Sequence, residues 1–340
     1  MIQRSRDPFA ALSSESRAKL RPAAPPTAVA PMLATLTDQR EFGDDWLLEH
    51  KFDGERCFAF VRRRDVALRS RSNRDVTSTY PELTSALGQE DSLDAVIDGE
   101  VTAVRGDEVL GFQHLQQRLG QASPSRQLVA AVPVGFCAFD LIYLEGHDLT
   151  GIPLTERKAL LRGATRFDDV VRYTDHVRGD SLAHFQWACA AGWEGLIAKK
   201  ADSTYSPGRS RLWLKLKCVA EQEFVVGGFT EPRGTRVGLG ALLLGYYEGN
   251  KLRYAGKVGT GFDRSVLTQL RTRLERLEQP ASPFAEPVRP VPSGTRWVRP
   301  ELVAQIGFGE WTKAGRLRHP RFLGLRDDKP ARSVVRERAR

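Results

Sequence analysis

The stretch KFDGER occupies residues 51–56 and separates two short apolar runs, WLLEH at 46–50 and CFAFV at 57–61. Each run is short, largely apolar and bounded by polar residues, which is typical of a β-strand. Gly54 favours a turn between them, since glycine adopts backbone conformations that other residues disfavour. We therefore predict two strands joined by a short loop in which charged side chains gather.

Apolar runs of the same kind continue to residue 217 and alternate with helical patterns. After the first two, the runs are VALRS, AVIDGEVTAV, VGFCAFDLIYL, GLIAKK and LWLKLK. The regions near 80–87, 112–119, 155–161 and 181–191 have the apolar periodicity of helices. This mixture predicts an α+β domain over residues 31–217.

The pattern changes after residue 217. Three strand-like runs that contain glycines come first, namely FVVGGFT, ALLLGYYEG and KLRYAGKVG. A helical pattern then covers about 262–277, and strand-like residues return at 297–306. Several short strands with one helix are typical of an OB-type β-barrel, which we predict for residues 218–330. An SH3-like barrel is the alternative.

The two ends of the chain differ from these domains. Residues 1–30 contain several prolines, which interrupt helices, and are predicted to form a flexible N-terminal arm. Residues 331–340, ARSVVRERAR, are predicted to be a basic tail in solvent.

The composition of the 340 residues is that of a globular protein, with 41% hydrophobic residues and a net charge of +9. This content excludes disorder of the whole chain, and no apolar run reaches the roughly 18 residues of a membrane span. The N-terminus lacks the apolar stretch of a secretory signal, so an intracellular protein is expected. The four cysteines are predicted to be free thiols, because no two of them form a Cys-x-x-Cys pair; they are Cys57, Cys137, Cys189 and Cys218. The positive charge suits a polyanionic partner such as nucleic acid.

Charged residues recur near the ends of the predicted strands. Glu100 completes the sequence Asp-Gly-Glu in one strand, Phe139 lies in another, and Glu194 precedes the GLIAKK run. In LWLKLK the basic residues alternate with apolar ones, and this period places Lys215 and Lys217 on one face of a strand. Taken singly, each charged residue is explained as well by ordinary solvent-exposed surface.

These short motifs, taken in their order along the chain, resemble those of the covalent nucleotidyltransferases, which are the DNA ligases, RNA ligases and mRNA capping enzymes. The motifs are Lys-x-Asp-Gly-x-Arg, Asp-Gly-Glu, Phe-Asp, Glu-Gly and Lys-x-Lys. The resemblance covers about residues 31–217. Three stretches of the C-terminal part resemble the ATP-dependent DNA ligases of bacterial end-joining systems: WVRPE at 297–301, GEWT at 309–312 and GLRDDK at 324–329. One departure is at 69–73, where RSRSN lacks the glycine that often follows the arginine.

This resemblance implies an adenylation domain of antiparallel sheets and flanking helices, followed by the OB-fold domain. It also implies a reaction in three phosphoryl transfers. Lys51 attacks the α-phosphate of ATP and becomes lysyl-AMP, the AMP passes to the 5′-phosphate at a DNA break, and the 3′-OH then attacks that phosphate. Since a free lysine has a pKa of about 10.4, we expect Lys215, Lys217 and a bound metal to lower the pKa of Lys51.

The resemblance assigns the other candidates to ligands of this reaction. Lys215 and Lys217 are expected to face the α-phosphate. Arg326 and Lys329 are expected to orient pyrophosphate in self-adenylation alone, which requires a hinge near residues 217–221. The nucleotide ligands are expected to be Phe139 and Ile197 on the two faces of adenine, Glu49 at its edge, and Arg56 and Arg71 at the nucleotide or the DNA 5′-phosphate.

Asp53, Glu100 and Glu194 are the expected ligands of Mg²⁺, with Mn²⁺ as the alternative, because carboxylate oxygens suit hard cations. The expected substrate is nicked or broken double-stranded DNA, bound through its phosphates without sequence preference. We further expect a monomer in the bacterial cytoplasm, associated with the nucleoid and not with a membrane, that acts beside end-joining or repair proteins.

Two other interpretations compete with a DNA ligase. An RNA ligase or a capping-type guanylyltransferase shares the first domain, and the motif at 318–329 with the strand pattern from 224 to 261 favours the DNA ligase over both. A non-catalytic OB-type DNA-binding protein with a degenerate first domain is the third interpretation, and the presence of every expected catalytic residue argues against it.

Overall fold

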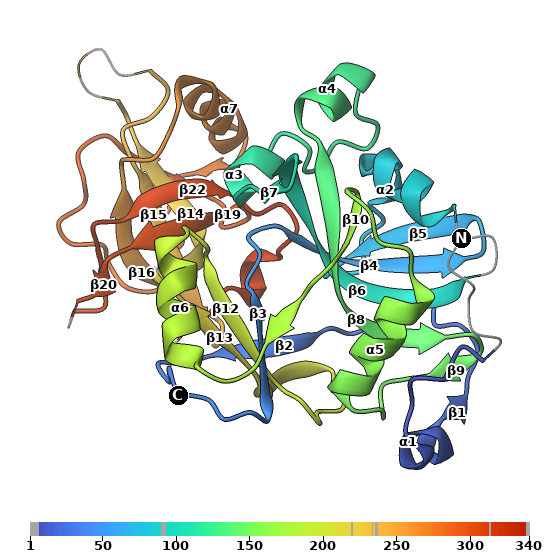
Figure 1. Cartoon of the computed structure of the whole chain (residues 1–340). Coiled ribbons are helices and arrows are strands. Elements are labelled where there is room, and N and C mark those ends of the chain that lie inside the picture. The colour runs from blue at the N-terminus through green and yellow to red at the C-terminus, as the bar shows by residue number, and fades with distance from the viewer. Residues whose placement is uncertain are drawn as a thin grey trace. The chain divides into compact units, whose positions relative to one another are not determined.

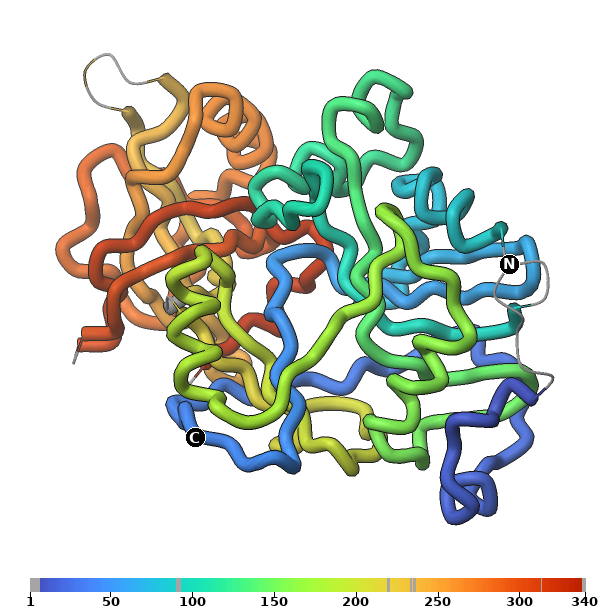
Figure 2. The backbone as a smooth tube through the Cα atoms, viewed as in Figure 1, coloured from blue at the N-terminus to red at the C-terminus, as the bar shows by residue number. Residues whose placement is uncertain are grey.

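The computed structural model describes residues 7–89, 93–218, 220–232, 234, 237–312 and 314–337. The chain forms two compact units, of which the first ends at Cys218 and the second follows it (Figures 1 and 2). No helix among these residues is long and apolar enough to cross a membrane. The mixed α+β class predicted from the sequence is confirmed, and each unit has its own sheet system.

The first unit contains a large sheet with the strand order β1-β9-β8-β6-β4-β5, to which β7 adds at β6 and β10 at β8. Every strand pair in it is antiparallel except β10 with β8. The central strand β8 is buried along its whole length. The strands are β1 (Arg21–Pro22), β4 (Glu55–Arg62), β5 (Asp65–Ser70), β6 (Asp94–Arg105), β7 (Glu108–Val109), β8 (Val134–Leu144), β9 (His147–Asp148) and β10 (Val171–Tyr173).

A second sheet in the same unit has the order β11-β3-β12-β13-β2. Its pairs are antiparallel except β13 with β2, which run parallel. The strands are β2 (Met32–Leu36), β3 (Trp46–His50), β11 (His176–Val177), β12 (Gly195–Lys200) and β13 (Gly208–Lys217).

Alternate residues of the two sheets fill different cores. Phe58 and Phe139 of the large sheet share one hydrophobic cluster with Met32 and Trp213 of the second sheet, so these faces pack together. The opposite face of the large sheet packs under α2 and α5, and that of the second sheet under α6 (Figure 1). The helices are α1 (Ser14–Lys19), the 3-10 turn η1 (Thr77–Thr79), α2 (Pro81–Leu87), α3 (Phe112–Leu115), α4 (Arg126–Ala131), α5 (Leu154–Ala164) and α6 (Ser181–Ala190).

The second unit is built on an antiparallel sheet in which β14 pairs with β15, β18 and β19. Helix α7 (Arg264–Glu275) contributes Leu267, Leu270 and Leu274 to its core. A short hairpin and the 3-10 turn η2 (Ala331–Ser333) complete the unit. The strands are β14 (Ala220–Thr230), β15 (Leu242–Glu248), β16 (Lys251–Val258), β17 (Glu278–Gln279), β18 (Thr295–Val298), β19 (Val303–Phe308), β20 (Glu310–Trp311), β21 (Leu317–Arg318) and β22 (Arg321–Leu325).

The predicted flexible arm is wrong for much of its length. Phe9 and Leu12 are buried in the core of the first unit, and β1 pairs with β9. The Ser13 and Ser16 hydroxyl groups donate hydrogen bonds to Glu156 at 3.0 and 2.8 Å. The prolines that motivated the prediction follow α1 instead of interrupting it, so they end the helix without loosening the segment. Residues 1–6 lie outside the described part.

The predicted solvated tail is also wrong for residues 331–337. Val334 is buried, and its carbonyl accepts a 2.7 Å hydrogen bond from the Tyr247 amide. The Arg332 and Arg336 guanidinium groups lie over aromatic rings of the second unit. The apolar valine therefore anchors a segment whose charges alone suggested exposure. Residues 338–340 lie outside the described part.

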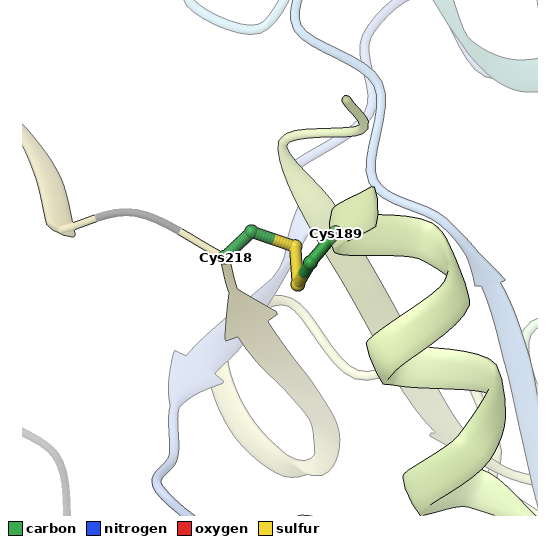
Figure 3. Close-up of a disulfide and its surroundings, with 2 residues drawn as sticks. All are labelled: Cys189 and Cys218. Atoms are coloured by element: carbon green, nitrogen blue, oxygen red, sulfur yellow. A yellow bond between two sulfur atoms is a disulfide. The ribbon is translucent and has the colours of Figure 1, made fainter. Parts of the chain in front are cut away.

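Two of the four cysteines are not free thiols. Cys189 and Cys218 form a disulfide with a Cα–Cα distance of 5.3 Å, whereas Cys57 and Cys137 are free and buried (Figure 3). The pair was missed because the two residues are 29 positions apart, and only the packing of α6 on its sheet brings them together.

Candidate active site

The second sheet of the first unit positions the candidate catalytic residues on one face. The register sets Gly195 beside Lys217, and Ile197 beside both Glu49 and Lys215. The alternate residues of β3, β12 and β13 point to the other face, where they are buried under α6. The predicted placement of Lys215 and Lys217 on one strand face follows directly from this alternation.

Lys51 lies immediately after β3 and forms an ion pair with Glu194, and its amide donates to the Gly195 carbonyl at 3.0 Å. The Lys217 ammonium is 3.7 Å from the other oxygen of the same carboxylate. The Lys51 side chain is 18% exposed, that of Glu194 6% and that of Lys217 9%. Two lysines thus share one carboxylate in a site that is largely closed to water.

Glycine at position 195 is required by this arrangement. The residue has φ of +151°, and a Cβ would lie 1.9 Å from the Leu216 carbonyl oxygen. Only glycine therefore lets β12 begin this close to β13. The close approach brings Glu194, the preceding residue, between Lys51 and Lys217.

The pKa of Lys51 is raised, which corrects the expectation that its basic neighbours lower it. Burial on its own lowers the pKa of this amine, but the carboxylate of Glu194, helped by those of Asp53 and Glu100, outweighs burial. Burial likewise raises the pKa of Glu194, and Lys51 and Lys217 reverse that shift to a net lowering. The cations around Lys51 are thus outweighed by the carboxylates that were expected to bind the metal.

The residues on either side of Lys51 rest on aromatic neighbours. The His50 ring stacks on Trp193 at 3.7 Å between centroids and lies 4.3 Å from the Phe52 ring. Burial lowers the pKa of His50 to about 4, with Glu194 acting in the opposite direction, so this histidine is neutral at pH 7. It fixes the strand end that carries Lys51 without adding a positive charge.

The loop after Lys51 is fixed by Asp53 and Gly54. The Asp53 carboxylate accepts a 2.8 Å hydrogen bond from the Phe112 amide at the start of α3. A Cβ on Gly54 would lie 2.2 Å from the Val101 carbonyl oxygen, so the loop lies directly against β6, the strand that carries Glu100. Asp53 therefore has a structural contact beside its expected role at a metal.

Arg56 is held inside the first unit. Its guanidinium donates to both oxygens of Asp98, at 2.9 and 2.6 Å, and to the Met32 carbonyl at 2.7 Å. It also donates to the Tyr205 hydroxyl at 3.3 Å. Arg71 lies close by, because its amide donates to the Arg56 carbonyl at 3.1 Å. Most of the Arg56 donors are thus engaged within the protein, although Arg56 was expected to bind the nucleotide or the DNA 5′-phosphate.

The residues expected at adenine surround a buried charge cluster. Glu49 pairs with Lys158 at 2.7 Å and with Lys199 at 2.6 Å, and it is 2% exposed. The Lys199 ammonium lies 4.3 Å from the centroid of the Phe139 ring, and burial lowers its pKa despite Glu49. Ile197 is paired with Glu49 in the neighbouring strand. Sequence reasoning missed Lys199, although its period-two spacing from Ile197 on the same strand was available.

Arg326 and Lys329 belong to the second unit and are paired there with carboxylates. Arg326 donates to both oxygens of Asp328 at 2.9 Å. The Lys329 ammonium is 2.8 Å from Glu223 on β14. The residues expected to bind pyrophosphate are thus held in place by acidic partners of their own unit.

The predicted magnesium ligands suit a hydrated ion better than direct coordination. Asp53, Glu100 and Glu194 all act electrostatically on the Lys51 amine, so each carboxylate lies in its neighbourhood. Among the residues that the structure describes, no three acidic, histidine or cysteine side chains come together as a direct metal centre. Mg²⁺ keeps several of its waters in such sites, and carboxylates around it bind partly through them.

Comparison with known proteins identifies the family of this site. Residues 31–217 match the family described as ATP dependent DNA ligase domain, and residues 235–329 match the ATP dependent DNA ligase C terminal region. The chain belongs to the ATP-dependent DNA ligases. Its first unit is accordingly the ligase nucleotidyltransferase domain and its second the OB-fold domain.

Several relatives of this ligase are known. The multifunctional non-homologous end joining protein LigD of Pseudomonas aeruginosa is 38% identical over 92% of this chain and 37% of its own length. The Mycobacterium tuberculosis LigD is 37% identical over 91% of this chain and 40% of its length. The chain therefore spans about two fifths of these relatives. A solved structure described as mycobacterial DNA ligase D complexed with ATP and MES has a TM-score of 0.66 and 36% identity, and the match covers 92% of this chain and 99% of that one.

Proposed function

We propose that this ligase joins the 3′-OH and 5′-phosphate ends of nicked or broken double-stranded DNA through a lysyl-AMP intermediate on Lys51. The observation that carries the proposal is the pairing of Lys51 and Lys217 on the single carboxylate of Glu194, on a sheet face that also presents Lys215. Lys51 is thus a nucleophile with two cations nearby, Lys215 and Lys217, that can neutralise the charge of a phosphate. The related ligase D structure was obtained with ATP, which supports ATP as the nucleotide.

The first step is attack of the Lys51 amine on the α-phosphorus of ATP with release of pyrophosphate. Lys215 and Lys217 neutralise the charge that builds up on the α-phosphate oxygens. Lys51 must be neutral to attack, and Glu194 opposes this as long as it faces only lysines. Lys51 therefore loses its proton only when another cation neutralises the Glu194 carboxylate.

Magnesium fits this requirement. Glu100 and Glu194 would hold it, with Asp53 beside them, largely through its water ligands. When bound, it supplies charge neutralisation for the phosphates. With its carboxylate at the metal, Glu194 would no longer favour the Lys51 ammonium, and the pKa of Lys51 would fall. Manganese would serve the same carboxylates.

The nucleotide is oriented by the residues on the strands beside Lys51. Phe139 and Ile197 stack on the adenine, and the backbone of Glu49 reads its edge while the carboxylate stays bound to its two lysines. Arg71 and the remaining donor of Arg56 face the sugar or the DNA 5′-phosphate. Lys199 supports the Phe139 ring from within the protein.

Arg326 and Lys329 act on pyrophosphate and therefore act only in self-adenylation. Their unit is expected to approach the nucleotide for the first step and to withdraw for DNA, with the hinge at residues 217–221, of which residue 219 lies outside the described part. The net charge of +9 favours phosphate contacts that do not depend on sequence. We place the enzyme in the cytoplasm at the nucleoid, as a monomer in DNA repair, because the relatives named above are end-joining proteins.

A nick-sealing assay tests this function. A duplex with one labelled 5′-phosphate nick is incubated with the full chain, magnesium and either ATP or GTP. We expect sealing with ATP only, and a transient adenylated DNA strand before the sealed product. An absence of sealing with every nucleotide, or sealing of RNA nicks alone, would contradict the proposal.

A further inference from the structure

Arg56 is fixed by a buried tyrosine, Tyr205, that the proposed mechanism does not use. The Tyr205 hydroxyl donates to Asp98 at 2.8 Å and accepts from the Arg56 guanidinium at 3.3 Å. It also accepts from the Met32 amide at 3.1 Å. Burial and the charge of Asp98 raise the pKa of Tyr205, so the hydroxyl keeps its proton and acts as a donor. Tyr205 thus joins the two members of the Arg56–Asp98 ion pair.

These contacts leave Arg56 with a single donor for a ligand. Two of its nitrogens donate to the Asp98 carboxylate, and the third donates to the Met32 carbonyl. With the bond to Tyr205, all but one of its N–H groups are used within the described part of the chain, and the remaining one belongs to Nη1. Bidentate binding of a phosphate needs a fork of two donors. A single donor instead suits one acceptor atom, such as the oxygen of a sugar hydroxyl.

Arg56 lies beside the ring that is expected to stack on adenine. Its Cζ is 5.3 Å from the centroid of the Phe139 ring. The Trp213 ring packs edge-on against both Phe139 and Tyr205, at 6.2 and 5.9 Å between centroids, so the three rings share one cluster. Arg56 is therefore close to any nucleotide that stacks on Phe139.

The same three residue types recur at the other end of strands β4 and β6. Arg62 pairs with Asp94 at 2.8 Å, and the Tyr143 hydroxyl lies 3.4 Å from the Asp94 carboxylate. Arg62 follows Arg56 by six residues along β4, which is about 20 Å at the rise of a strand. This second set gives a matched control for removal of a tyrosine hydroxyl beside an ion pair.

We propose that Tyr205 is a positioning residue for nucleotide binding, because its hydroxyl holds Arg56 so that the remaining donor meets a hydroxyl group of the ATP sugar. The inference rests on the proposed function, in which the sugar and the DNA 5′-phosphate are alternatives for this donor, and it selects the sugar. Without the hydroxyl, Arg56 loses an acceptor and Asp98 loses a donor, so the guanidinium is less firmly oriented. The nucleotide then binds more weakly, whereas Lys51 keeps its contacts.

The experiment measures self-adenylation of the pyrophosphate-treated full chain in single turnovers with ATP, 2′-deoxy-ATP or 3′-deoxy-ATP. Each analogue lacks one sugar hydroxyl. The test variant is Tyr205→Phe, which removes the hydroxyl and keeps the ring against Trp213. Tyr143→Phe is the matched control, and thermal denaturation monitors the fold of both variants. Sealing of pre-adenylated nicked DNA is measured in parallel.

We expect Tyr205→Phe to raise the ATP concentration that gives half the maximal rate about fivefold, with little change in the maximal rate. Wild type is expected to prefer ATP over one of the analogues by about tenfold, and Tyr205→Phe by about twofold at most. Sealing of pre-adenylated nicks is expected to be unchanged, and Tyr143→Phe to resemble wild type throughout. A general loss of stability would lower the rates with all three nucleotides alike, so the preference for ATP reports on positioning.

An unchanged preference for ATP in Tyr205→Phe, the same loss in Tyr143→Phe, or a loss confined to DNA sealing would overturn the inference. Asp98→Asn is the second variant if Tyr205→Phe does not fold, since it weakens the hold on the same guanidinium. It is expected to reduce the preference for ATP, and an unchanged preference there would overturn the inference as well. A wild type that ATP does not label at all would instead refute the proposed function.

Discussion

Replacing Glu194 with glutamine removes the charge that keeps Lys51 protonated and leaves the side-chain size unchanged. Both Lys51 and Lys217 pair with this carboxylate, the longer contact being 3.7 Å, and all three side chains are largely buried. Two unit charges at such a distance attract by about 4 kcal/mol when the effective dielectric constant is about 20. This corresponds to a factor of about 10³ in the protonation equilibrium. The Lys51 amine of E194Q is therefore expected to lose its proton at a much lower pH than that of the wild type.

The assay is acylation of Lys51 by acetic anhydride, which reacts with neutral amines, followed by mass spectrometry of the Lys51 peptide over a range of pH. Near neutral pH we expect E194Q to be acylated at least about tenfold faster than wild type. Glu41→Gln, which changes an exposed carboxylate, is the matched control and is expected to resemble wild type. Self-adenylation by E194Q is expected to fall even so, because the substitution removes a proposed magnesium ligand. Identical acylation profiles for E194Q and wild type would refute the role given to Glu194.

Three further predictions concern other parts of the enzyme. Arg326→Ala and Lys329→Ala are each expected to slow self-adenylation at least about tenfold and to spare the sealing of pre-adenylated nicked DNA; equal losses in both assays would count against the divided role. Gly54→Ala places a Cβ 2.2 Å from the Val101 carbonyl oxygen, so thermal denaturation should show a loss of about 1–3 kcal/mol, and an unchanged melting temperature would contradict this packing. Phe139→Leu is expected to raise the KM for ATP roughly tenfold with little change in kcat, and an unaltered KM would remove Phe139 from the adenine site.

The sequence predicted those elements whose apolar pattern is strong. The helix expected at 155–161 is α5, Leu154–Ala164, which buries Leu160 and Leu161 in the core. Helix α4, Arg126–Ala131, was missed because its six residues are too few to show a helical period, and none of them is fully buried. The N-terminal arm failed for a related reason, since Phe9 and Leu12 are isolated apolar residues whose burial depends on distant parts of the chain.

The sequence predicted the features of the site that depend on the spacing of residues within one strand. It did not predict the contacts that depend on how distant strands pair. Alternation within one strand was enough to place Lys215 and Lys217 on one face. The contact of Glu194 with Lys51 depends on residues 143 positions apart, and its effect on the pKa of Lys51 reverses what the cations alone suggest. Lys199 and the disulfide were missed for the same reason, because pairings between strands and helices carry no local pattern.

We propose that Lys51 is the nucleophile that receives AMP. The most direct measurement is intact mass spectrometry of pyrophosphate-treated enzyme after incubation with ATP and magnesium, followed by fragmentation to locate the added group. We expect a mass gain of one AMP, located on Lys51, and no gain for Lys51→Ala. A gain located on any other residue, or a gain that persists in Lys51→Ala, would contradict it.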